Sequence, residues 1–137
     1  MTTLPIQLIK QYFQYLMDEY GFCVDREQYS PDTMGNAEVV VKLDSTTVQV
    51  VIDRSQVLIK VGATEWSERK WLDFAAVARY FDPSLKEAYV FPEVAEMRVE
   101  IQLDRLAHML RQDCEPVLRG DFSMAKQIRE RRRGSNY

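Results

Sequence analysis

The stretch VQVVIDRSQVLIKVG, residues 48–62, decides the fold, because apolar side chains alternate along it on both sides of a short polar break. A period of two places alternate side chains on one face of a β-strand, so this stretch predicts a hairpin with one buried face. A turn at Arg54 and Ser55 pairs Ile52 with Val57, and the same register pairs apolar residues further along both strands. Neither turn residue is the asparagine or glycine that a tight hairpin turn prefers, which leaves a wider loop in the same register as an alternative.

A run rich in valine, residues 37–43, precedes the hairpin and predicts a third strand. With a loop over residues 44–47, Leu43 would pair with Val48. This register agrees with that of the following hairpin about which face of the middle strand is buried, and a slip by one residue would break the agreement. The three runs therefore predict an antiparallel meander.

Helical periodicity precedes the meander. Apolar residues recur at three- and four-residue steps over residues 5–20, which predicts an N-terminal amphipathic helix that stops at Gly21. Residues 23–36 contain proline, glycine, aspartate and asparagine, and they predict an irregular connection between this helix and the sheet.

Further helices are predicted after the meander. Ser67 is a suitable N-cap for a helix over residues 68–81. A leucine-rich run predicts a helix from about residue 93 to about residue 115, which Pro116 kinks or ends. Residues 124–133 have the composition of a terminal helix.

The order of these elements predicts the α+β class. We expect an N-terminal helix, a three-stranded antiparallel meander and two to three C-terminal helices packed on one face of the sheet. Residues 1–122 are predicted to form a single α+β domain, and residues 123–137 a basic C-terminal helix or tail.

The chain has 137 residues, 46% of them hydrophobic and 28% charged, a composition typical of one globular domain. The N-terminus lacks the charged segment, apolar run and cleavage site of a signal peptide, and no apolar run is long enough to span a membrane. We therefore expect a cytoplasmic protein without a membrane partner.

Residues that commonly carry catalysis or bind metals are sparse. Cys23 and Cys114 lie far apart and outside any paired-cysteine motif, and we expect both to be buried and reduced. His108 is the single histidine, which is too few for a zinc site, and its place on an amphipathic segment favours a half-buried structural role. No phosphate-binding glycine loop or metalloprotease motif occurs. The sequence predicts a non-enzymatic protein with no catalytic residue, no metal site and no cofactor.

The two predicted registers also define the outer face of the meander. They place three apolar residues in one row and two lysines in the next: Val40, Val51 and Leu58, then Lys42 and Lys60. An apolar centre with a polar rim is the usual anatomy of a protein–protein interface. Trp66 could extend this patch, because tryptophan is favoured at binding hot spots. The alternative is that a helix or the aromatic segment 89–91 covers the row.

The net charge of −3 is unevenly distributed. Residues 124–137 carry five cations and Glu130, a net charge of +4, which leaves −7 for the remainder. An acidic body favours cationic partners over nucleic acid. As an alternative function, the basic run could bind nucleic acid through four arginines: Arg129, Arg131, Arg132 and Arg133. A further alternative is a small-molecule pocket around Tyr80, Tyr89 and His108.

Five segments together carry a resemblance to a known group of proteins: LIKQYFQYLMDEYGF, GNAEVVVKL, VQVVIDRSQVLIKVG, DFAAVARYF and LAHMLRQDCEPVL. Over residues 6–122 the chain resembles small bacterial proteins of unassigned function that are associated with polymorphic-toxin immunity proteins. The shared features are hydrophobic spacing and an Asp-Arg pair at the hairpin turn, here Asp53 and Arg54. The resemblance implies an immunity-like module that binds a protein partner, and it implies no catalytic residue. The acidic body favours a cationic toxin as that partner, and self-association through the apolar row is the alternative.

Overall fold

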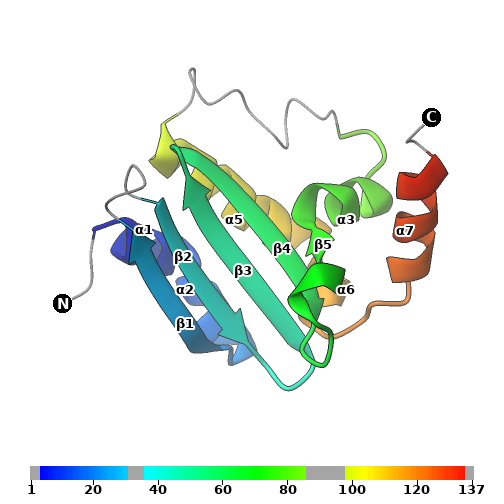
Figure 1. Ribbon diagram of the computed structural model, residues 1–137, viewed down its shortest axis with the longest axis horizontal. Coiled ribbons are helices and arrows are strands. Elements are labelled where there is room, and N and C mark those ends of the chain that lie inside the picture. Colours follow the sequence, from blue (N-terminus) through cyan, green and yellow to red (C-terminus); the bar gives the residue numbers. More distant parts are fainter. Residues whose placement is uncertain (1–3, 31–35, 86–97, 135–137) are drawn as a thin grey trace.

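Alternating valines and isoleucines form the centre of an antiparallel sheet. In the computed structural model, which describes residues 4–30, 36–85 and 98–134, with side chains up to residue 131, the sheet has five strands in the order β1-β2-β3-β4-β5 (Figure 1). The strands are β1 (Cys23–Ser30), β2 (Asn36–Lys42), β3 (Thr46–Asp53), β4 (Gln56–Ala63) and β5 (Leu72–Asp73). The α+β class and the antiparallel sheet are thus confirmed, whereas the prediction of three strands is wrong.

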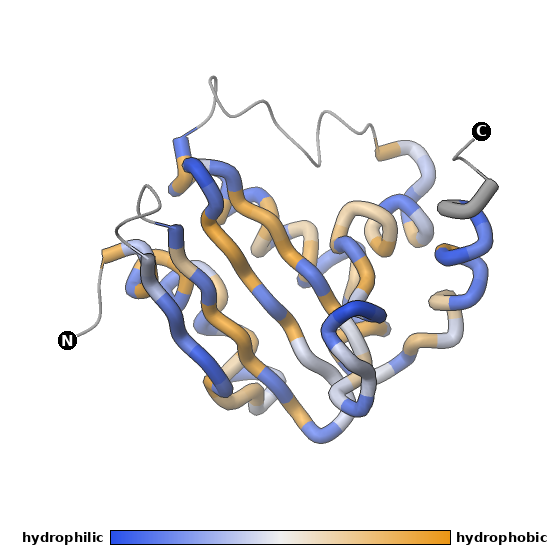
Figure 2. Tube along the Cα trace, in the orientation of Figure 1, coloured by the Kyte–Doolittle hydropathy of each residue, from blue (hydrophilic) through white to orange (hydrophobic). Residues whose placement is uncertain are grey.

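Strand β1 occupies the segment that was predicted to be an irregular connection. Seven of its eight residues are exposed. Its sequence, CVDREQYS, is mostly polar and lacks the alternation of apolar residues that indicates a half-buried strand (Figure 2). It pairs with β2 from Cys23 to Ser30, with a bulge between Val24 and Arg26. Cys23 is exposed here, which contradicts its predicted burial. An edge strand that packs little can be recognised only from its hydrogen-bonding partner.

The segment predicted as one helix over residues 68–81 contains three elements. A 3-10 turn, η2 (Glu68–Lys70), precedes β5, and the helix α3 (Phe74–Phe81) begins only after that strand. Ser67 is extended and makes no side-chain cap hydrogen bond. Because Leu72 pairs with Val61 on β4 and is buried, sheet pairing overrides the helical periodicity at this point.

The second hairpin has the predicted register, with Ile52 opposite Val57 and Val50 opposite Ile59. Its turn is the tight two-residue form, since Arg54 and Ser55 both have positive φ angles, of 52° and 67°. The side chain of Asn36 supports this turn. Its Oδ1 accepts a hydrogen bond from the Arg54 amide at 3.0 Å, and its Nδ2 donates to Asp53 Oδ1 at 3.0 Å.

We expect Ser55→Gly to raise the free energy of unfolding by about 0.5–1 kcal/mol, because glycine adopts a positive φ without the steric cost that serine incurs. Urea denaturation of the variant measures the change. Ser67→Gly is the matched control, since Ser67 is exposed and has a φ of −69°. An equal loss of stability in both variants would contradict the expected relief of strain.

The register of the first hairpin differs by two residues from the prediction. Val48 pairs with Val41 rather than with Leu43, and the strand begins at Thr46. Thr46 is buried and donates its hydroxyl hydrogen to the carbonyl oxygen of Val117 at 3.0 Å, while the Thr47 hydroxyl lies 3.0 Å from that of Thr64. These distant partners satisfy two polar side chains that the sequence assigns to a loop. The buried face of β3 stays as predicted, because a shift of two residues preserves the alternation.

The described helices are α1 (Leu4–Tyr12), α2 (Gln14–Tyr20), α3, α5 (Val99–Asp113), α6 (Glu115–Leu118) and α7 (Ala125–Gly134). The predicted N-terminal helix is interrupted at Phe13 and ends at Gly21, whose φ is 82°. The predicted break near Pro116 is confirmed, because α5 ends at Asp113 and Pro116 lies in the first turn of α6. The predicted start of this helix near residue 93 lies outside the described residues. None of the helices in the described part of the chain has the length and apolar character needed to cross a membrane.

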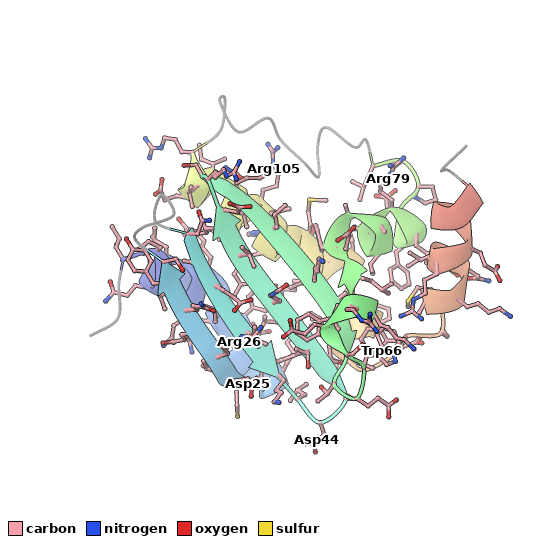
Figure 3. The ribbon with its side chains drawn as sticks, viewed as in Figure 1. Asp25, Arg26, Asp44, Trp66, Arg79 and Arg105 are labelled. Atoms are coloured by element: carbon pink, nitrogen blue, oxygen red, sulfur yellow. The ribbon has the colours of Figure 1, made fainter. Side chains whose placement is uncertain are left out.

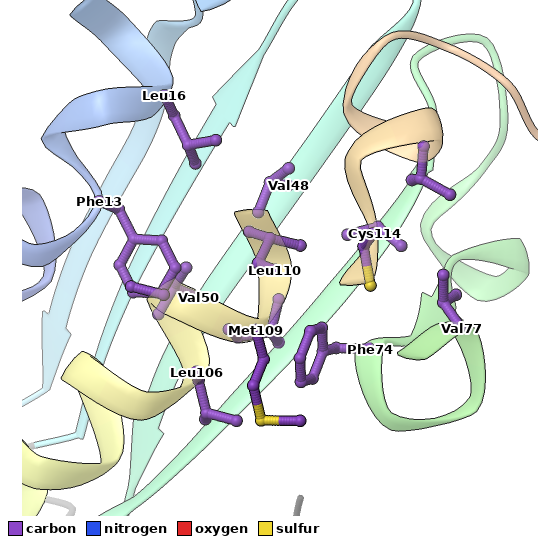
Figure 4. Close-up of a cluster of buried hydrophobic side chains, with 14 of the residues drawn as sticks. Phe13, Leu16, Val48, Val50, Phe74, Val77, Leu106, Met109, Leu110 and Cys114 are labelled. Carbon is purple, nitrogen blue, oxygen red and sulfur yellow. The ribbon is translucent and has the colours of Figure 1, made fainter. Parts of the chain in front are cut away.

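One hydrophobic core lies between the sheet and the helices behind it. Figure 1 views the sheet from its other face, with α1, α2 and α5 behind it and with α3 and α7 beyond the β4–β5 edge. Phe13, Leu16 and Leu110 from the helices pack with Val48 and Val50 of the sheet (Figure 4). Met124, Ala125 and Ile128 are also buried, so the start of α7 packs into the same core.

Candidate functional site

The candidate site is the face of the sheet that points away from α1, α2 and α5, here called the open face. Its side chains form cross-strand rows. One row contains Gln28, Glu38, Val51 and Leu58, and the next contains Arg26, Val40, Gln49, Lys60 and Asp73. Both rows follow from the observed β2–β3 register. Compared with the predicted register, every β2 residue is shifted by two positions along β3.

The predicted apolar row of Val40, Val51 and Leu58 is therefore not continuous. Val51 does pair with Leu58, as predicted, but its β2 partner is Glu38 rather than Val40. Val40 lies opposite Gln49 and is only 1% exposed. Val51 and Leu58 are each partly exposed, so they form the accessible apolar centre of the open face.

An ion-pair network borders this centre on the β1–β2 side. Arg26 Nε lies 2.9 Å from Glu38 Oε1, and Arg26 Nη2 lies 2.9 Å from Glu68 Oε1 of η2 (Figure 3). Gln49 also donates a hydrogen bond to Glu38. The hydrogen bonds that Arg26 donates to Glu38 and Glu68 raise the pKa of its guanidinium. Arg26 was not predicted as a site residue, because its segment was predicted to be an irregular connection.

The two lysines predicted for the rim have different surroundings. Lys42 Nζ lies 3.1 Å from Asp25 Oδ1, at the bulge of β1. Lys60 is exposed and pairs in register with Gln49 on one side and Asp73 on the other. The observed register separates them, because Lys42 pairs with Thr47 rather than with Gln49.

Trp66 lies beside Gly62, near the C-terminal end of β4, rather than beside Val51. The centroid of the Trp66 ring lies 5.0 Å from that of Phe122. The guanidinium carbon of Arg129 lies 4.6 Å from the centroid of the Trp66 ring. A Cβ added at Gly62 would come within 3.2 Å of Trp66 Cε3 and 2.4 Å of Trp71 Cδ1. The two indoles therefore pack over the glycine, and Trp66 is largely occupied by contacts within the chain.

The arginines of the basic run are also partly occupied. Arg129 donates a hydrogen bond to the Lys70 carbonyl oxygen at 2.9 Å, in addition to its stacking on Trp66. The Arg131 guanidinium carbon lies 5.5 Å from the centroid of the Tyr80 ring. The side chains of Arg132 and Arg133 lie outside the described part of the chain. The structure thus places at least two of the four arginines against the domain.

The residues considered for a small-molecule pocket are not brought together. Tyr80 of α3 lines a pocket with residues of β5 and α7, whereas the side chain of His108 is 70% exposed on α5, which corrects its predicted half-burial. Tyr89 lies outside the described residues. Burial raises the pKa of the Cys114 thiol, which disfavours the thiolate that a nucleophile requires.

No family model, curated protein or solved structure matches this chain.

Proposed function

We propose that this protein is a non-enzymatic, immunity-like module that binds a cationic protein through the open face of its sheet. The observation that carries the proposal is the accessible pair Val51 and Leu58, which lies at the centre of a face that α1, α2 and α5 leave uncovered. An apolar centre with a polar rim suits a protein partner.

The rim supports this proposal because two of its cations are already in ion pairs. Arg26 is held by Glu38 and Glu68, and Lys42 by Asp25. Side chains fixed before binding lose less conformational entropy when a partner arrives. The rim therefore offers an ordered polar surface around the apolar centre.

The charge distribution favours a cationic partner. Residues 1–123 carry a net charge of −7, since the whole chain is −3 and residues 124–137 contribute +4. Opposite charge accelerates the encounter of two proteins and disfavours partners of like charge. A net negative body also disfavours nucleic acid, because the phosphates carry charge of the same sign.

The edge of the sheet is a poorer binding site than its open face. At the β1 edge, the bulge between Val24 and Arg26 and the charged run from Asp25 to Glu27 hinder the addition of a further strand. At the other edge, β5 has only two residues. We therefore favour side-chain recognition on the face over strand addition.

The test combines this protein with the product of the adjacent gene, measured by isothermal titration calorimetry. We expect the double variant Val51→Asp, Leu58→Asp to weaken binding at least about 30-fold, because two charges would enter the apolar centre of the interface. Ile101→Asp is the matched control, since Ile101 is 48% exposed on α5 and lies outside the open face. Circular dichroism and urea denaturation establish that each variant is folded.

Full-strength binding by the double variant would show that the open face is not the interface. Dimerisation of the wild-type chain that the double variant abolishes, measured by sedimentation, would instead assign a second copy to this face. Binding that weakens equally in the Ile101→Asp control would contradict the assignment to Val51 and Leu58.

A further inference from the structure

A pocket of about 460 Å³ lies between β5, α3 and α7, at the β4–β5 end of the molecule. Its apolar lining comes from Leu72 on β5, Ala75 and Ala76 on α3, and Ile128 on α7. The volume falls within the range of small-molecule sites. The consecutive elements β5 and α3 and the distant helix α7 therefore line a space with an apolar wall.

The polar lining of this pocket is predominantly cationic. Among the lining residues that the structure describes, Arg79, Arg129 and Arg131 are cations and Asp73 is the one carboxylate, so these four carry +3 and −1, a net charge of +2. Arg79 is exposed on α3 (Figure 3). A cationic pocket in a chain with a net charge of −3 is a local inversion of sign that favours an anionic ligand.

Two of these arginines are already held in place. Arg129 stacks on Trp66 and donates to the Lys70 carbonyl oxygen. Arg131 lies over Tyr80, whose hydroxyl donates to Gln127 Oε1 at 2.6 Å. A guanidinium that stacks on a ring keeps in-plane N–H donors available, in the arrangement that binds carboxylate or phosphate oxygens.

We propose that this pocket binds a small organic anion, with a carboxylate or phosphate group held by Arg79 and Arg131 and an apolar body against Leu72 and Ile128. The two parts of the ligand correspond to the two parts of the lining. The site is distinct from the Val51–Leu58 centre and does not depend on the protein partner.

The test is an NMR titration of the full-length ¹⁵N-labelled protein with phenyl phosphate, inorganic phosphate and benzyl alcohol. We expect phenyl phosphate to give saturable shifts at β5, α3 and α7, and to bind at least about fivefold more tightly than either of the other two probes. Added salt should weaken the binding of phenyl phosphate.

Variants assign the contact to the arginines. Arg79→Gln is expected to weaken phenyl phosphate binding about tenfold, as the loss of a charge-assisted hydrogen bond would. Arg98→Gln is the control, because Arg98 is exposed at the start of α5 and does not line the pocket. Arg79→Gln removes an exposed side chain, so the variant should keep its fold, which its own spectrum verifies.

Three results would overturn the proposal. The first is a set of shifts that grow linearly with phenyl phosphate without saturation. The second is equal affinity for phenyl phosphate and inorganic phosphate, which would remove the apolar body from the ligand. The third is an equal loss of affinity in the Arg79→Gln and Arg98→Gln variants.

Discussion

Replacing Gln102 with leucine is expected to lower the free energy of unfolding by about 2–4 kcal/mol, because the change leaves two hydrogen-bonding backbone groups without their partner. Gln102 is fully buried on α5. Its Oε1 accepts a hydrogen bond from the Val57 amide at 2.9 Å, and its Nε2 donates to the Ser55 carbonyl oxygen at 2.8 Å. This side chain therefore joins the helix to the turn of the central hairpin.

Urea denaturation of Gln102→Leu measures the loss, and amide hydrogen exchange at Val57 locates it. Gln112→Leu is the matched control, since Gln112 lies on the same helix and is exposed. A loss of stability as small in Gln102→Leu as in the control would mean that the hairpin turn does not depend on α5.

Replacing Gly62 with alanine is expected to cost about 1–3 kcal/mol, the usual range for overpacking a filled site. The added methyl group would come within 2.4 Å of Trp71 Cδ1 and 3.2 Å of Trp66 Cε3. Trp66 cannot withdraw freely, because Phe122 and Arg129 hold its ring. Trp71 must therefore move, and its fluorescence emission should change with the loss of stability.

A double-mutant cycle tests this explanation. In a Trp71→Ala background the added methyl group has room, so Gly62→Ala should cost less there than in the wild-type chain. Within the described residues, the buried Trp71 Nε1 has no hydrogen-bond partner, so the loss of the indole leaves no acceptor unpaired. Additive effects of the two substitutions would show that the methyl group does not clash with Trp71.

The sequence predicted the central strands well because their signal is local. In β3 and β4, alternation of valine and isoleucine fixes the buried face, and the short break between the runs fixes their pairing at Ile52 and Val57. The first hairpin was misaligned because Thr46 and Thr47 are polar and resemble loop residues. Their burial depends on Val117 and Thr64, which are remote in the sequence.

Only part of the candidate site was predicted, because only part of it depends on local sequence. The adjacency of Val51 and Leu58 follows from the hairpin alone, whereas the neighbours of this pair depend on the register of β2. Arg26 could not be selected, because β1 becomes a strand only by pairing with β2. The cationic pocket could not be predicted from the sequence either, because Arg79 and Arg131 line one pocket only when α7 packs beside α3.

The sequence by itself determined the α+β class, the buried face of the central hairpin, and the acidic body with its basic end. These properties depend on composition and on periodicity over short stretches of chain, which no distant contact is needed to establish. Only the tertiary structure decided the two edge strands, the β2–β3 register, the packing of Trp66 and Trp71 over Gly62, and the pocket between α3 and α7. Each of these features depends on hydrogen bonds or packing between residues that are far apart in the chain. Local periodicity cannot reveal such partners, as the buried hydrogen bond from Thr46 to Val117 illustrates.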